Sequence, residues 1–169
     1  MNGSVPTTRG FTLIELVLVI LLLGILAAFA VPKWLGKGGV ETQTLRDELV
    51  TRLRLVQNAN MNESSVRCTQ LVVDVAGFAH LTQAMTGITC PAPGAISGWS
   101  DNLRTRGRLV TPSSDIRITL GGSRSFVVRF DRMGRPLAAC NGGCEVRVSD
   151  GSETVGLRIE SEGYIHEIP

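Results

Sequence analysis

A long apolar segment near the N-terminus constrains this chain more than any other feature. From Phe11 to Val31 the sequence reads FTLIELVLVILLLGILAAFAV, and Glu15 is its only charged residue. At about 1.5 Å per residue, an α-helix of this length spans about 30 Å, which is the thickness of the hydrocarbon core of a bilayer. We therefore expect residues 11–31 to cross a membrane.

The position of Glu15 argues against the two simplest explanations of this segment. A secretory signal would be cleaved after Ala28-Phe29-Ala30, but the apolar core of such a signal is usually about 7–15 residues long and carries no acid. A plain membrane anchor would leave the carboxylate unpaired in hydrocarbon, at a cost of about 2.5–3.5 kcal/mol.

Cleavage between Gly10 and Phe11 would give this carboxylate a partner. The new α-amino group of Phe11 would lie one helical turn from Glu15, on the same face. The two charges would pair within one chain or between staggered neighbouring chains, and a paired charge is tolerated in apolar surroundings where a lone charge is not. Pairing between chains would also set their register.

The residues around this site resemble a known processing motif. Gly10-Phe11-Thr12-Leu13-Ile14-Glu15-Leu16 is similar, position by position, to the motif of type IV prepilins and type II secretion pseudopilins. The resemblance implies that residues 1–10 are a leader peptide, that a prepilin peptidase cleaves between Gly10 and Phe11 and methylates Phe11, and that Glu15 guides assembly. It also implies a helix kink at Pro32. This close resemblance covers residues 9–35.

The same resemblance implies where the chain acts and with what partners. The precursor would lie in the inner membrane as a single-pass protein, with its C-terminal domain in the periplasm. The mature chain would then enter a pilus or pseudopilus together with other pilins and the pilus or secretion assembly machinery. The few flanking positive charges do not settle the orientation by themselves, because Arg9 lies before the segment and Lys33 and Lys37 lie after it.

Beyond the membrane segment, the hydrophobic pattern predicts a second helical stretch and then a β domain. Apolar residues recur at helical spacing at Leu45, Leu49, Leu53 and Val56. We expect a helix over residues 11–62 whose second half packs this stripe on a sheet. Residues 63–169 alternate with a period of two between regular turns, which predicts a mainly antiparallel β domain. The fold class is therefore α+β, and the resemblance makes it pilin-like.

Turn signals within the β domain predict its hairpins. Gly121-Gly122, between Ile116–Leu120 and Ser125–Phe130, indicates a two-residue hairpin turn. Asp150-Gly151 indicates a second hairpin. Residues 91–115 are rich in Pro, Gly, Ser and Asp, and we expect a long loop with one short strand near residues 108–110.

A second, shorter resemblance lies in the β domain. Phe130-Asp131-Arg132-Met133-Gly134-Arg135-Pro136 is similar to a hairpin of GspH- and FimT-type minor pseudopilins. The length, the four cysteines and the all-β tail are most similar to minor pilins of the mannose-sensitive haemagglutinin (MSHA) pilus. These resemblances imply a structural subunit, not an enzyme, that assembles into or primes the filament. The alternatives are a minor pseudopilin of type II secretion and a tip pilin that binds DNA or a receptor.

The four cysteines favour disulfides if the domain is periplasmic. Cys140 and Cys144 enclose the turn-forming residues Asn141-Gly142-Gly143, so this pair is easily closed, and Cys68 and Cys90 then remain for each other. Three pairings are open in principle. We expect neither a zinc site nor a redox-active dithiol, because the spacing is a poor match to zinc motifs and no C-x-x-C is present. We also expect no cofactor.

Two groups of arginines raise the question of DNA binding. Arg104, Arg106 and Arg108 alternate and would share one face in an extended backbone. A second group, around one turn, consists of Arg129, Arg132 and Arg135. The sequence favours a solvated face over a DNA site, because the total of 17 basic and 15 acidic residues excludes a broad basic field and aromatic residues are not interleaved. The acids expected to balance these arginines are Asp101, Asp115 and Asp131.

The two histidines carry no recognisable catalytic motif. His80 lies in an apolar run, and His166 lies in the predicted last strand. We therefore expect both to be structural and assign no catalytic residue.

Overall fold

The computed structural model describes residues 11–35, 37–63 and 66–168, with side chains described at 11–26, 39–63 and 66–168. The predicted leader, including Gly10, lies outside the described residues. The chain divides into two compact units, Met1–Lys37 and Gly38–Pro169, and we call the second the β unit.

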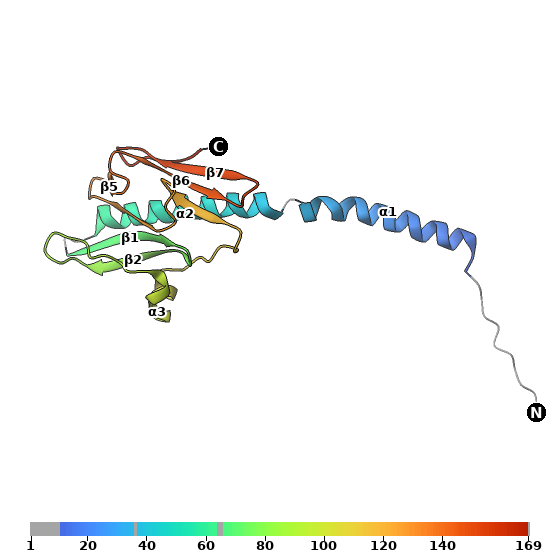
Figure 1. The fold of residues 1–169 in the computed structure, drawn as a ribbon, viewed down its shortest axis with the longest axis horizontal. Helices are drawn as coiled ribbons and strands as arrows, with labels where there is room; N and C mark the ends of the chain where they lie inside the picture. The colour runs from blue at the N-terminus through green and yellow to red at the C-terminus, as the bar shows by residue number, and fades with distance from the viewer. Residues whose placement is uncertain (1–10, 36, 64–65, 169) are drawn as a thin grey trace, which may run out of the picture. The chain divides into compact units, whose positions relative to one another are not determined.

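The first unit contains one helix, α1, which runs from Leu13 to Leu35 (Figure 1). Its backbone is helical on both sides of Pro32, whose side chain lies outside the described part, so the kink there stays a prediction. Over the rest of the predicted helical region, residues 11–62, the structure describes a second helix, α2, at Lys37–Asn62, and Gly36 between the two helices lies outside the described residues. Within the described residues, no helix is both long enough and apolar enough to cross a membrane.

The β unit consists of α2 and two antiparallel four-stranded sheets on either side of it (Figure 1). The first sheet has the order β2-β1-β4-β5, and its strands are Gly77–Ala84, Arg67–Asp74, Phe126–Phe130 and Pro136–Ala138. The second sheet has the order β3-β6-β7-β8, and its strands are Arg117–Leu120, Cys144–Ser149, Thr154–Ile159 and Ile165–Ile168. The predicted α+β fold, a helix packed on antiparallel sheets, is confirmed.

One hydrophobic core joins α2 to both sheets. The predicted stripe is buried at all four positions, with Leu45, Leu49, Leu53 and Val56 exposing 7%, 1%, 1% and 0% of their surface. Val128 and Leu157 contribute to this core from the first and second sheet respectively. Burying a leucine of this kind stabilises the fold by about 1.5–3 kcal/mol, so the stripe is the main attachment of α2.

The turn predicted at Gly121-Gly122 is present, but the hairpin predicted around it is wrong. Both glycines have positive φ angles, 56° and 86°, and the backbone groups of Leu120 and Ser123 bond to each other across the turn. However, β3 then pairs with β6, and β4 pairs with β1 in the other sheet. Turn chemistry is local, whereas strand pairing depends on which apolar faces can be buried together, and here the chain crosses between sheets after the turn.

The expectation of an irregular loop over residues 91–115 is also corrected. A short 3₁₀ helix, η1 (Ile96–Gly98), and a short helix, α3 (Asp101–Arg106), lie in this segment. The hydroxyl of Ser100 caps α3 by accepting a hydrogen bond from the Leu103 N–H. The predicted strand near residues 108–110 is reduced to a single bridge between Val110 and Phe78.

This segment covers the face of the first sheet that α2 leaves open. Ile96 and Trp99 are buried there in a second cluster with Val72, Ala79 and Leu81. The carboxylate of Asp74 holds the segment in place by accepting a hydrogen bond of 2.7 Å from the Ile96 N–H. The first sheet is thus covered on both faces.

Candidate functional site

The described part of the predicted processing motif, Phe11 to Leu16, leads into the first turn of α1. The Glu15 N–H bonds to both the hydroxyl and the carbonyl of Thr12, at 3.3 and 3.1 Å. Thr12 therefore occupies the N-cap position and Glu15 the third helical position, which is the spacing of a capping box. The carboxylate of Glu15 also lies at the positive end of the helix dipole. The motif thus sets the first turn of the helix as well as its charge pattern.

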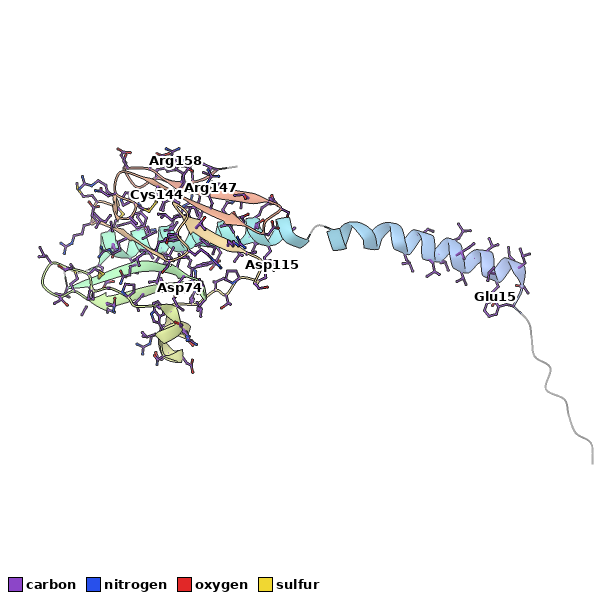
Figure 2. All side chains as sticks on the ribbon, in the orientation of Figure 1. Glu15, Asp74, Asp115, Cys144, Arg147 and Arg158 are labelled. Carbon is purple, nitrogen blue, oxygen red and sulfur yellow. A yellow bond between two sulfur atoms is a disulfide. The ribbon has the colours of Figure 1, made fainter. Side chains whose placement is uncertain are left out.

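The described surface of α1 is apolar on every side. Eleven of its large hydrophobic side chains are 44–82% exposed in the isolated chain, at Leu13, Ile14, Leu16, Leu18, Val19, Ile20, Leu21, Leu22, Leu23, Ile25 and Leu26, and Phe11 just before the helix is 75% exposed. A helix that is hydrophobic all round is stable only where lipid or other helices cover it. Glu15 stands alone as an acid on this apolar surface (Figure 2).

Both predicted disulfides are present. Cys68 joins Cys90 with an S–S distance of 2.04 Å, and Cys140 joins Cys144 at 2.06 Å. The first links the beginning of β1 to the loop after β2, and the second closes the turn before β6. In the chain-entropy account, a loop of the size that Cys68 and Cys90 close stabilises the fold by about 3 kcal/mol.

The two histidines have structural partners. His166 Nε2 lies 2.9 Å from Glu160 Oε1, and its ring stacks on Tyr164 with 5.2 Å between the centroids. His80 Nδ1 lies 3.4 Å from Nη1 of the buried Arg52. In the described part of the chain, no group of three His, Cys, Asp or Glu residues is arranged to hold a metal ion.

The environment of His80 predicts that stability depends on pH. Burial, followed by the positive charges of Arg52 and Arg108, lowers the pKa of His80 from its ordinary value of 6.5. The unfolded chain therefore takes up this proton at a higher pH than the folded chain does. As the pH falls through 6.5, protonation favours the unfolded chain and the free energy of unfolding should decrease.

His80→Gln should remove part of that decrease. The measurement is denaturant unfolding of wild type and variant between about pH 7.5 and pH 5. His166→Gln, which alters a histidine that lies beside the carboxylate of Glu160, is the matched control. A wild-type decrease that His80→Gln leaves unchanged would show that other groups cause it.

The structure separates the arginines that the sequence grouped together. Arg104 and Arg106 lie on α3 and Arg108 has a left-handed φ of 49°, so the predicted extended face of three arginines is wrong. The cap at Ser100 and the favourable first-turn acid Asp101 allow a helix there.

In the second group, one arginine is neutralised within the protein. Arg135 Nε lies 2.9 Å from Asp131 Oδ2. Partial burial raises the pKa of Asp131. Hydrogen bonds from the backbone and side chain of Arg135 and from the Met133 N–H lower that pKa by a larger amount, so it ends below its ordinary value. The other two, Arg129 and Arg132, line a pocket instead.

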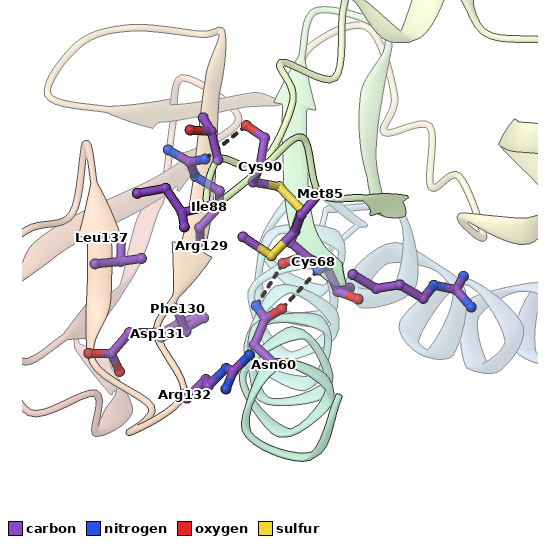
Figure 3. Close-up of a pocket in the computed structure, with 13 residues that line it drawn as sticks. Asn60, Cys68, Met85, Ile88, Cys90, Arg129, Phe130, Asp131, Arg132 and Leu137 are labelled. Carbon is purple, nitrogen blue, oxygen red and sulfur yellow. Dashed lines mark hydrogen bonds between the residues drawn. A yellow bond between two sulfur atoms is a disulfide. The ribbon is translucent and has the colours of Figure 1, made fainter. Parts of the chain in front are cut away.

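This pocket, of about 410 Å³, lies beside the Cys68–Cys90 disulfide (Figure 3). Its wall comes from the end of α2, the beginning of β1, the loop after β2, the end of β4 with the turn that follows it, and β5. The lining residues are Asn60, Arg67, Cys68, Thr69, Met85, Ile88, Thr89, Cys90, Arg129, Phe130, Asp131, Arg132 and Leu137. Sequence reasoning identified its cysteines and arginines but not the site, because segments so far apart carry no common spacing.

Comparison with known proteins gives one match to a family and one to a solved structure. Residues 6–31 match the family described as the prokaryotic N-terminal methylation motif. The fold is similar to the crystal structure of the type IV minor pilin FimU of Pseudomonas aeruginosa (strain PAO1), with a TM-score of 0.47 and 10% sequence identity, over 75% of this chain and 92% of that chain. A comparison with curated proteins found no match.

Proposed function

We propose that this chain is a type IV pilin-like subunit, made as a prepilin and assembled into a filament. A prepilin peptidase would cleave between Gly10 and Phe11 and methylate Phe11. The observation that carries this proposal is the match of residues 6–31 to the N-terminal methylation motif, because Gly10, Phe11 and Glu15 all lie within it. The role is structural rather than catalytic.

The apolar surface of α1 supports two successive environments for this helix. Before assembly, residues 11–31 would lie in the inner membrane, where lipid covers the exposed side chains. After assembly, the helices of neighbouring subunits would replace the lipid. Both environments bury the same apolar surface of α1, which is favourable by about 25 cal/mol per Å² relative to water. The exchange of lipid for neighbouring helices takes place at α1 and needs no refolding of the β unit.

Glu15 would determine how subunits dock. A carboxylate at the third helical position is stabilised by the helix N-terminus in its own chain, whereas the α-amino group of Phe11 beside that same terminus is not. An additional carboxylate would therefore stabilise the positive charge of the Phe11 amine. We propose that Glu15 of an incoming subunit pairs with the Phe11 amine of the subunit before it, and that this pair fixes their axial offset.

The β unit would lie in the periplasm and then on the outside of the filament. Its two disulfides support an oxidising compartment. Among type IV systems we propose a minor pilin of an MSHA-like pilus, on the basis of the chain length, the four cysteines and the β-rich C-terminal part.

Mass spectrometry of the chain from cells that contain a prepilin peptidase tests this function. The native protein should begin at Phe11 and carry one additional methyl group. Gly10→Leu should leave an uncut precursor that begins at Met1, because a bulky residue replaces the glycine before the cleaved bond. The matched control is Gly3→Leu, which makes the same change away from the cleavage site and should be processed normally. A native chain that begins at Met1 or Val31 would contradict the proposal.

A further inference from the structure

The pocket beside the Cys68–Cys90 disulfide contains a positive charge that the protein does not neutralise. Arg129 Nε is buried and has no hydrogen-bond partner, and Arg129 Nη1 reaches only the Cys90 carbonyl, at 3.4 Å. Among the described residues, no carboxylate lies within ion-pair distance of Arg129. Arg129 is half-buried, and a guanidinium with a buried, unpaired N–H and no anion beside it is unfavourable, so this position favours binding of an anionic group from outside.

The acid in the pocket wall is not available to Arg129. Asp131 Oδ1 accepts hydrogen bonds of 2.8 Å from the N–H groups of Met133 and Arg135, and Asp131 Oδ2 accepts one of 2.9 Å from Arg135 Nε. Arg132 is exposed and lies at the other end of the pocket from the Arg129 guanidinium (Figure 3). An anion that enters would therefore meet the Arg129 guanidinium at one end of the pocket and the Arg132 guanidinium at the other (Figure 3), while the carboxylate in the wall is already occupied.

The remaining wall of the pocket combines apolar and polar side chains and is firmly held. Phe130 is buried, Leu137 is 39% exposed, and Ile88 at the rim is 95% exposed. The disulfide fixes one side. On another side, Asn60 of α2 exchanges two hydrogen bonds with the backbone of Thr69, at 2.7 and 2.8 Å. Because the disulfide and these hydrogen bonds hold its wall, the pocket has its shape before any ligand binds. Less conformational entropy is then lost on binding.

Exposed apolar side chains continue from this pocket across the turn between β4 and β5. On the other side of that turn, a second hollow is lined by Met61, Met133 and Tyr164, which are 48%, 73% and 67% exposed. Methionine, tyrosine and arginine are the residue types enriched at protein interfaces. The combined surface is more extended than a small molecule would need, and it suits a polypeptide segment.

We propose that this pocket binds an aspartate or glutamate side chain of a partner polypeptide, presented next to an apolar residue. The carboxylate would lie against Arg129, and the apolar side chain would pack on Ile88 and Leu137, while Arg132 adds positive charge at the other end of the pocket. The proposal rests on the β unit alone and does not depend on how the N-terminus is processed.

A nucleic acid is the weaker candidate for this pocket. Phosphate would satisfy Arg129, but recognition of single strands also uses exposed aromatic rings for base stacking, and Phe130 is only 4% exposed. Arg135, which would extend the basic surface, is already paired with Asp131.

Isothermal titration calorimetry of the full chain in a nonionic detergent tests the proposal. The probe is the peptide acetyl-Ala-Leu-Glu-Leu-Ala-amide, and its matched control replaces Glu by Gln. We expect the Glu peptide to bind with a dissociation constant below about 1 mM and the Gln peptide to bind at least about tenfold more weakly. Arg129→Gln should weaken binding of the Glu peptide at least about tenfold.

Two further variants keep the result interpretable. Arg117→Gln removes an exposed arginine of β3 and should change binding less than about twofold. Ile88→Ser changes a side chain that is 95% exposed, so the fold should survive, and we expect about threefold weaker binding. Equal binding of the Glu and Gln peptides, no effect of Arg129→Gln, or no binding at about 5 mM peptide would overturn the proposal. Binding of a dT oligonucleotide that Arg129→Gln abolishes, without peptide binding, would assign the pocket to nucleic acid instead.

Discussion

Glu15→Val is expected to be cleaved and methylated normally and yet to be almost absent from filaments. The substitution lies beyond the cleaved bond, so the peptidase site remains. The substitution removes the carboxylate that pairs with the Phe11 amine of a neighbouring subunit. Removing one partner of a buried charge pair typically costs about 3–5 kcal/mol, which corresponds to a decrease in docking of more than about a hundredfold.

The measurement is the fraction of the chain in sheared filaments relative to the membrane fraction, by immunoblot. Valine also removes the acid of the capping box, so a second variant is needed to separate helix initiation from charge. Glu15→Gln retains a side chain that suits a capping box but removes the charge. We expect the same loss of incorporation for Gln as for Val. If the Gln variant enters filaments as wild type does, the role of Glu15 is to begin the helix and not to pair with the amine.

Gly163→Ala is expected to cause a large loss of stability in the β unit. Gln57 Nε2 of α2 donates hydrogen bonds to the carbonyl oxygens of Gly134 and Gly163, at 2.7 and 2.8 Å, and so ties the turn after β4 and the turn after β7 to the helix. Gly163 has a φ of +93°, and a Cβ at this position would overlap the Gly134 carbonyl and lie 2.6 Å from Gln57 Nε2. Backbone strain and steric overlap together should remove at least about 3 kcal/mol of the free energy of unfolding.

Gly151→Ala provides a matched control for this experiment. Gly151 has a nearly identical φ of +91°, but a Cβ there would meet no atom within 4 Å. It should therefore report backbone strain alone, at about 1 kcal/mol. Denaturant unfolding of the full chain, with both disulfides oxidised, gives the two values. Equal losses in the two variants would show that the contact among Gly163, Gly134 and Gln57 does not hold the turns to α2.

A feature could be predicted from the sequence when the residues that form it lie close together along the chain. The apolar helix and the buried stripe of α2 involve residues close together along the chain, and their pattern can be seen in the sequence directly, whereas the cap at Thr12 was not predicted. The short Cys140–Cys144 link is encoded in the same local way, and the Cys68–Cys90 pairing followed from it. By contrast, α3 was missed because a Ser cap within a loop-like composition is a weak signal.

The chain by itself thus determined the motif around Phe11, the apolar helix, the α+β class and the easily closed Cys140–Cys144 link, because each arises from near neighbours or from simple alternation along the backbone. Only the tertiary structure decided that β3 and β4 belong to different sheets, and that Arg129, Cys90 and Asn60 enclose one pocket. Burial of apolar surface favours folding but is not directional. The apolar residues of one segment therefore do not specify which distant segment will pack against them.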